Sequence, residues 1–241
     1  MTPRKAKIDA SFTVNSKEDL LNFLKKQNLS LPPYKERTKQ HWEKLGIYLL
    51  LITWSKTNNL SYPLILNHQD KPDFQLSHGN KNIGIEFTVA CDQNTEAIFA
   101  LAQQEDKPAM VASDEFGPGA PPLTAEQKRQ IINRPRRITT PGFGDDGMEK
   151  SWCSWIIKTI KDKTNDFEKP EFKKYDENWL LIYDETLVAL AKTQTAVNFL
   201  LSDIQGYWTQ PTHYDRIFIQ RYDVLVDIRP DNWQTYPRVG I

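Results

Sequence analysis

The stretch from Lys71 to Thr88 reads KPDFQLSHGNKNIGIEFT and decides how the rest of the chain is interpreted. Two short runs in which apolar and polar residues alternate, 73–77 and 82–88, lie on either side of Gly79 and Asn80. A Gly-Asn pair between two alternating runs favours a two-residue hairpin turn of type I′ or II′. The stretch therefore predicts a β-hairpin.

The register of this hairpin brings two acidic side chains together. With Gly79 and Asn80 as the turn, Asp73 lies opposite Glu86 on one face of the ribbon. Directly opposed residues have Cβ atoms roughly 5 Å apart, and like charges at that distance are destabilising. Water around an exposed pair, a retained proton or a bound divalent cation would each relieve the repulsion. The other face is apolar, with Leu76 opposite Ile83 and Phe74 opposite Ile85.

The order of residues around these two acids resembles a known motif. Pro72-Asp73, then a gap, then Glu86-x-Thr88 at the end of an apolar strand is similar to the core motif of the PD-(D/E)xK nuclease superfamily. The resemblance implies a restriction-endonuclease-like α/β fold, a mixed central sheet flanked by helices. It also implies that Asp73, Glu86 and the Phe87 carbonyl hold Mg²⁺ or Mn²⁺, and that the protein hydrolyses phosphodiester bonds in nucleic acid, with DNA as the expected substrate.

Thr88 is the position at which this chain departs from the family motif, which has lysine there. A hydroxyl group supplies no positive charge, so a catalytic role for the motif would need a lysine from elsewhere: Lys71, Lys161 or Lys163. A second hypothesis is a catalytically inactive nuclease fold that serves as a binding or assembly module. A third is a structural protein whose two acids face water.

A third acidic residue is predicted on the helix before the hairpin. Residues 34–55 carry apolar side chains at helical spacing, and Glu43 borders their inward face. Nuclease relatives often supply a further acid from this helix, so the resemblance implies a catalytic role for Glu43. The alternative is a surface acid that pairs with a residue four positions away. His68 falls in the predicted connector before the hairpin, either as a metal ligand or as part of a polar turn.

The remaining pattern predicts one domain over residues 1–241, with an N-terminal helical extension over 1–33. Strands are expected at 62–67, 178–184, 216–220 and 223–228, the second of them central because it is almost continuously apolar. Helices are expected at 95–104, 124–133, 148–167 and 193–204, and coil after Arg229. Recurrent Gly and Pro predict a long irregular insertion at about 105–147.

Positive charge is concentrated in that insertion. Arg134, Arg136 and Arg137 follow Arg129 closely in sequence. Arginines on a loop favour contact with a phosphate backbone, and we expect these three side chains to contact nucleic acid. A solvated surface loop is the alternative.

Composition excludes several other classes. The chain of 241 residues has 31 basic and 31 acidic side chains, so no overall charge attracts nucleic acid or membrane. Two distant cysteines argue against a disulfide framework and a zinc ribbon. The sequence has neither a Gly-rich phosphate loop with a following Lys-Ser/Thr nor a GxSxG nucleophile motif. No apolar segment is long enough for a signal peptide or a membrane span, which predicts a cytoplasmic protein.

Overall fold

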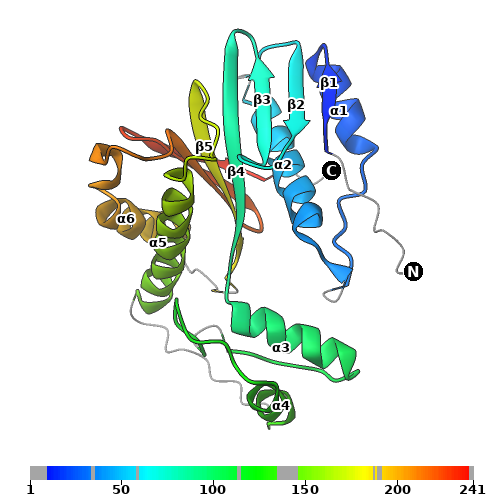
Figure 1. Ribbon diagram of the computed structural model, residues 1–241, viewed down its shortest axis with the longest axis vertical. Coiled ribbons are helices and arrows are strands. Elements are labelled where there is room, and N and C mark those ends of the chain that lie inside the picture. Colours follow the sequence, from blue (N-terminus) through cyan, green and yellow to red (C-terminus); the bar gives the residue numbers. More distant parts are fainter. Residues whose placement is uncertain are drawn as a thin grey trace.

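The computed structural model describes residues 10–33, 36–57, 60–112, 115–134, 146–186, 188 and 192–238. Within these ranges the chain forms a mixed sheet of eight strands in sequential order, with helices on both faces (Figure 1). This confirms the predicted α/β class. The strands are β1 (Phe12–Val14), β2 (Leu64–His68), β3 (Phe74–His78), β4 (Lys81–Cys91), β5 (Glu177–Glu185), β6 (Arg216–Gln220), β7 (Val224–Ile228) and β8 (Trp233–Pro237). The helices are α1 (Lys17–Lys25), α2 (Lys39–Ser55), α3 (Gln93–Gln104), α4 (Ala125–Asn133), α5 (Gly147–Phe167) and α6 (Thr193–Asp203).

The hairpin of β3 and β4 has the predicted register. Phe74 pairs with Ile85 and Leu76 with Ile83, and the pairing of the two strands ends at Phe74. Gly79 has a φ of +57°, a conformation that glycine adopts without steric cost, whereas Asn80 has no positive φ. This combination is typical of a type II′ turn, which has glycine at its first central position.

The centre of the sheet is parallel. β4 runs parallel to β5, and β5 parallel to β6, while the remaining neighbours are antiparallel. The four residues from Trp179 to Ile182 in β5 are at most 1% exposed, as predicted for a central strand. The prediction of coil after Arg229 was wrong, because residues 233–237 form the edge strand β8. Only one side of this strand is paired and its side chains are largely exposed, so it carries no regular alternation of apolar residues.

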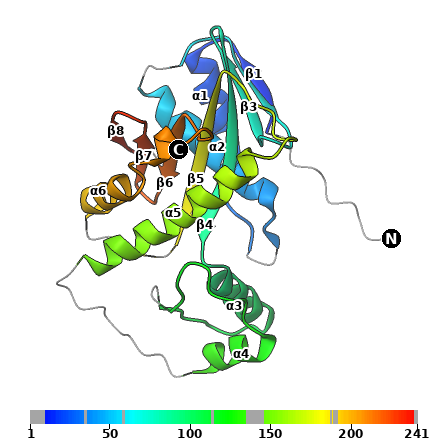
Figure 2. The ribbon, with the colours of Figure 1, turned by 60° about the vertical axis from the view of Figure 1, so that its left-hand side comes forward.

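Two hydrophobic cores lie on opposite faces of the sheet. α2 packs on one face, against the apolar side of the β3–β4 hairpin, and α5 and α6 pack on the other (Figure 2). α2 begins at Lys39 rather than at residue 34, with Thr38 as its N-cap, whose carbonyl accepts from the His41 amide over 3.1 Å. None of the helices in the described ranges is long and apolar enough to cross a bilayer.

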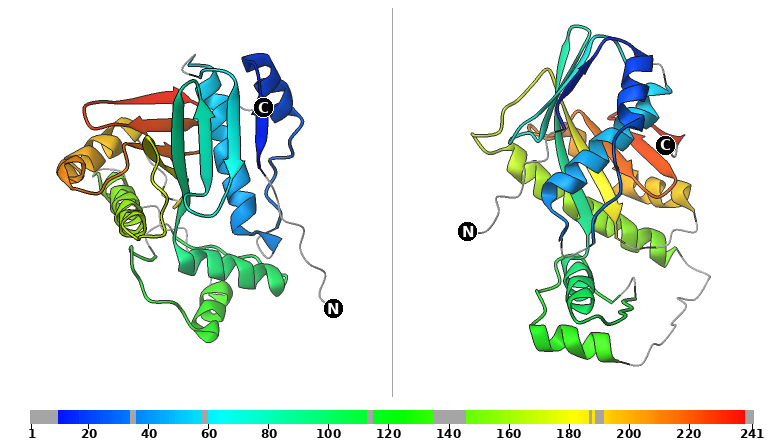
Figure 3. Two further views of the ribbon diagram at one scale, coloured as in Figure 1. Left: turned by 45° about the horizontal axis from the view of Figure 1, so that its top comes forward. Right: turned by 90° about the vertical axis from the view of Figure 1, so that its right-hand side faces the viewer.

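Part of the predicted insertion folds against α3. α4 has Thr124 as its N-cap, as expected, and Ile132 packs against Ile98 and Ala102 of α3 in a small core of its own. The buried Asn94 side chain ties the two segments together: it donates to the Pro121 carbonyl and accepts from the Leu123 amide. Figure 3 shows α3 and α4 side by side beyond the end of the sheet.

Candidate functional site

Asp73 lies just before the first residue of β3, where β4 continues beyond its pairing with that strand. Its carboxyl group is buried, with 1% of the residue exposed. Because β3 no longer pairs with β4 beyond Phe74, the Phe87 amide has no partner from that strand, and it donates to Oδ2 of Asp73 over 2.8 Å instead. Lys39 of α2 donates to Oδ1 over 2.5 Å. The end of the strand pairing thus fixes the position of this carboxylate.

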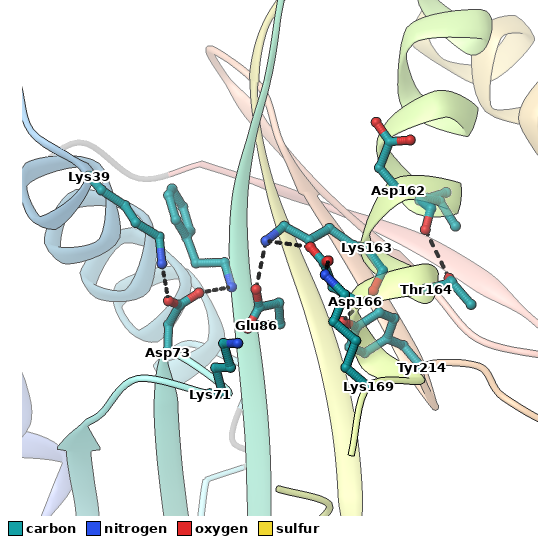
Figure 4. Close-up of polar contacts among 12 residues, drawn as sticks. Lys39, Lys71, Asp73, Glu86, Asp162, Lys163, Thr164, Asp166, Lys169 and Tyr214 are labelled. Carbon is teal, nitrogen blue, oxygen red and sulfur yellow. Dashed lines mark hydrogen bonds and ion pairs between the residues drawn. The ribbon is translucent and has the colours of Figure 1, made fainter. Parts of the chain in front are cut away.

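Glu86 is the second buried acid, 6% exposed, and it projects toward α5. Lys163 donates to its Oε1 over 2.7 Å, whereas Oε2 is buried without a hydrogen-bond partner. Figure 4 shows Asp73 on the Lys39 side of β4 and Glu86 on the Lys163 side. The prediction that the two acids face each other on one side of the ribbon was therefore wrong, because the strand pairing stops at Phe74 and Asp73 turns toward α2. Burying an unpaired carboxylate oxygen costs free energy, so Oε2 of Glu86 is available to a ligand that brings positive charge.

The two acids influence each other electrostatically. Burial raises the pKa of Asp73, the negative charge of Glu86 raises it further, and Lys39 opposes both, with the result that the pKa is about 7. The interpretation that the two acids face water on an open polar surface is therefore wrong, since both are buried. Proton retention and cation binding remain as ways to relieve the repulsion.

Glu43 adjoins this site and is held by two partners. Lys39 bridges Glu43 and Asp73, at 2.9 Å from the former, and His68 Nε2 lies 2.9 Å from Glu43 Oε2. Burial on its own would raise the pKa of Glu43, but the hydrogen bonds from His68 and Lys39 lower it to about 2. Glu43 does make the i, i+4 pair, but it is 3% exposed and so is not a surface acid; its catalytic role stays a prediction.

His68 is not part of a polar connector. It is the last residue of β2, its side chain is 6% exposed, and its ring stacks on Phe74 at 4.9 Å between centroids. The prediction that His68 falls in the connector before the hairpin was therefore wrong. Its role is to orient Glu43.

Lys163 reaches the site from the helix that covers the opposite face. Tyr214 donates to the Lys163 carbonyl over 3.2 Å, so the buried tyrosine anchors this turn of α5. The other lysines considered for the missing positive charge are elsewhere: Lys161 is exposed, and Lys71 pairs with Glu171 on the surface. Thr88 itself is half-buried in β4.

The donor set at this site consists of two carboxylates. Within the described ranges, no three His, Cys, Asp or Glu side chains are grouped as a metal site. Both oxygens of Glu43 have a partner, Oε1 in Lys39 and Oε2 in His68, whereas Oε2 of Glu86 has none, so we take Asp73 and Glu86 as the predicted ligands. Two carboxylates and a strand-end backbone suit Mg²⁺, which is usually bound by one or two protein carboxylates and keeps several waters.

The predicted nucleic-acid contacts are only partly described. Arg134 forms a bidentate ion pair with Glu115, at 2.9 and 2.7 Å. Its charge is therefore balanced within the insertion. Arg136 and Arg137 lie outside the described residues.

Lys39 and Tyr214 are the residues of the site that sequence reasoning missed. The spacing of four between Lys39 and Glu43 was visible in the sequence, but Tyr214 is brought to α5 only by the fold. In all, the site contains two buried carboxylates, each with its own lysine, on a hairpin that bridges the two faces of the sheet. Comparison with protein-family models, curated proteins and solved structures found nothing that matches this chain.

Proposed function

We propose that this protein is a metal-dependent nuclease of the PD-(D/E)xK type, with a restriction-endonuclease-like fold, that hydrolyses phosphodiester bonds in nucleic acid, most simply DNA. Asp73 and Glu86 would hold Mg²⁺ or Mn²⁺, together with the Phe87 carbonyl. When bound, such an ion activates water and polarises a phosphoryl oxygen.

One observation supports this proposal above the others: two buried carboxylates, one with an unpartnered oxygen and the other with a pKa of about 7. Burying two negative charges close enough to repel each other does little to stabilise a fold, so stability alone does not explain this arrangement. Perturbed acids at a strand end are instead typical of functional sites. The mixed sheet with α2 and α5 on opposite faces agrees with the proposed fold.

Lys163 takes the place of the motif lysine in this proposal. Its ammonium group already contacts Glu86, so it lies beside the predicted ligands although it comes from α5 rather than from β4. When a cation binds Glu86, the Lys163 side chain, 19% exposed, is free to turn toward a bound phosphate and stabilise the charge that develops there. Lys39 holds Asp73 and Glu43 in position from the other side.

The alternative, an inactive nuclease fold that binds or assembles, is favoured by Thr88 and by the lysines themselves. Each of the two carboxylates already has an ammonium partner. Such ion pairs can be permanent, in a protein that never binds a metal, rather than pairs that a metal ion replaces. The active nuclease should bind a divalent cation at Asp73 and Glu86, whereas the inactive module should not.

Cleavage of a supercoiled plasmid and of a labelled single strand, with Mg²⁺ or Mn²⁺, tests the proposal. We expect the wild-type protein to cleave, and Asp73→Asn and Glu86→Gln to reduce cleavage to the level without metal. Asp162→Asn, which changes an exposed acid on α5, is the matched control and should retain activity. Calorimetric titration with Mg²⁺ separates the alternative: no binding to the wild-type protein would favour the inactive module.

A further inference from the structure

A second polar pocket lies at the opposite end of α2 from Lys39. It has a volume of about 770 Å³, within the range of about 300–1,000 Å³ usual for ligand sites, and lies between the last turn of α2 and the edge strand β8. α2 has 17 residues, so its two ends are about 24 Å apart, and Lys39, which contacts Asp73, is at the end away from the pocket. It is a separate place on the molecule.

The side chains around this pocket are basic and neutral. Lys56 and Arg229 supply positive charge, Asn232 and Gln234 supply amides, and Tyr236 supplies an aromatic ring. Among the described residues that line it, none is Asp or Glu. The pocket is therefore unsuited to a cation and offers both charge and hydrogen bonds to an anion.

Two residues that line the pocket, Arg229 and Gln234, donate to one buried carboxylate, that of Asp227. Asp227 is fully buried and accepts two hydrogen bonds from Arg216, at 2.6 and 2.5 Å. Arg229 adds a third contact at 3.2 Å, and Gln234 a fourth at 3.1 Å. Arg216 and Arg229 share this carboxylate, and Arg216 also interacts with the charge of Glu177, so the positive charge at the pocket itself comes from Arg229 and Lys56.

Arg229 also has an unsatisfied donor. Its Nε is buried and has no hydrogen-bond partner, although the side chain as a whole is 35% exposed. A buried donor without an acceptor costs free energy, and the cost is larger for a charged group. A phosphate oxygen in the pocket would remove that cost.

The end of α2 opposes an anion only weakly. The negative end of a helix dipole has only a small effect on a charge at an exposed position. Its last carbonyls are also partly satisfied, since the Thr57 hydroxyl donates to the Trp54 carbonyl over 2.7 Å and the Lys56 amide to the Thr53 carbonyl over 3.2 Å. Charge-assisted hydrogen bonds from two cationic side chains to a phosphate are stronger than this effect.

We propose that this pocket binds the phosphate group of a nucleotide unit, with Lys56 and Arg229 on the phosphate and Tyr236, Asn232 and Gln234 beside the attached nucleoside. The nucleotide comes either from solution or from a nucleic-acid backbone. The inference goes beyond the proposed nuclease activity and does not depend on it, because it involves neither Asp73 nor Glu86.

Isothermal titration calorimetry in EDTA, where no cleavage occurs, tests this pocket. The probes are inorganic phosphate, adenosine 5′-monophosphate and a short thymidine oligonucleotide. Lys56→Gln removes a charge, and Asn232→Asp places a repelling charge in the pocket, both at exposed positions. Lys26→Gln is the matched control, because Lys26 is the exposed C-cap of α1 just as Lys56 is the exposed C-cap of α2.

We expect saturable binding of at least one probe, weakened about tenfold by Lys56→Gln and by Asn232→Asp and unchanged by Lys26→Gln. Binding of the monophosphate identifies a free nucleotide as the source, and binding of the oligonucleotide alone identifies the backbone. The proposal is overturned if no probe binds saturably, or if Lys26→Gln weakens binding as much as Lys56→Gln does.

Discussion

Asp73 is the residue whose ionisation most clearly links the site to the stability of the fold. Its pKa of about 7 lies above the ordinary value of 3.8, first because it is buried and then because of Glu86. Between these two values the folded chain retains a proton that the unfolded chain has lost, so stability falls as the pH rises. The shift corresponds to at most about 4 kcal/mol.

A neutral side chain at this position should remove that dependence. Without divalent metal, the wild type should lose about 2 kcal/mol or more of its free energy of unfolding between about pH 5.5 and pH 8.5 as Asp73 gives up its proton, whereas Asp73→Asn should not. The stability of the variant relative to the wild type should therefore rise by that amount. Urea denaturation followed by tryptophan fluorescence measures the difference, with Asp162→Asn as the exposed control. A difference that does not change with pH would show that Asp73 is ionised throughout this range.

Thr88 and Lys163 offer a second prediction at the level of single residues. If Lys163 supplies the positive charge that the motif normally carries, Lys163→Met should reduce cleavage about 100-fold or more. The same change should strengthen Mg²⁺ binding, because it removes a cation that competes for Glu86. Adding Thr88→Lys to Lys163→Met should then restore part of the activity. Equal cleavage by Lys163→Met and the wild type would rule out this role for Lys163.

At the level of secondary structure, the alternation and spacing of apolar residues predicted most of the buried strands and helices. The Gly79-Asn80 hairpin, the apolar run of β5 and the Thr124 cap of α4 each carry a local pattern, and the structure confirms all three. β8 has no such pattern, because an exposed edge strand needs no apolar face. The contacts of Lys39 with Asp73 and of Lys163 with Glu86 join residues far apart in sequence, so no local pattern contains them.

The attachment of the segment before α4 to the start of α3 can be tested with one substitution. Asn94→Ala removes both hydrogen bonds that hold the chain at 121–123 to the start of α3. We expect faster amide exchange and proteolysis over residues 115–134, with the main thermal transition nearly unchanged, because the sheet does not depend on this contact. Asn198→Ala, on the exposed side of α6, is the control. A lowered main transition would mean that α4 stabilises the whole domain.

At the scale of the whole molecule, the site depends on how closely α2 approaches β4. Phe87 has its ring in the core beneath α2, while its amide donates to Asp73. The ring lies so close to α2 that a Cβ added at Gly46 would be 2.2 Å from its Cε2 atom. The same residue thus connects helix packing to the position of a predicted ligand.

Gly46→Ala should therefore affect both stability and the site. Alanine gains about 1 kcal/mol over glycine in a helix, but the contact with Phe87 is far shorter than any Cβ tolerates, and overpacking of this kind costs about 1–3 kcal/mol or more. We expect a net loss of about 2 kcal/mol in urea denaturation, and weaker Mg²⁺ binding in calorimetry because the Phe87 amide moves relative to Asp73. Gly206→Ala, where an added Cβ meets nothing within 4 Å, should change neither. If Gly46→Ala lowers stability but leaves Mg²⁺ affinity intact, the position of Asp73 does not depend on the packing of α2 against β4.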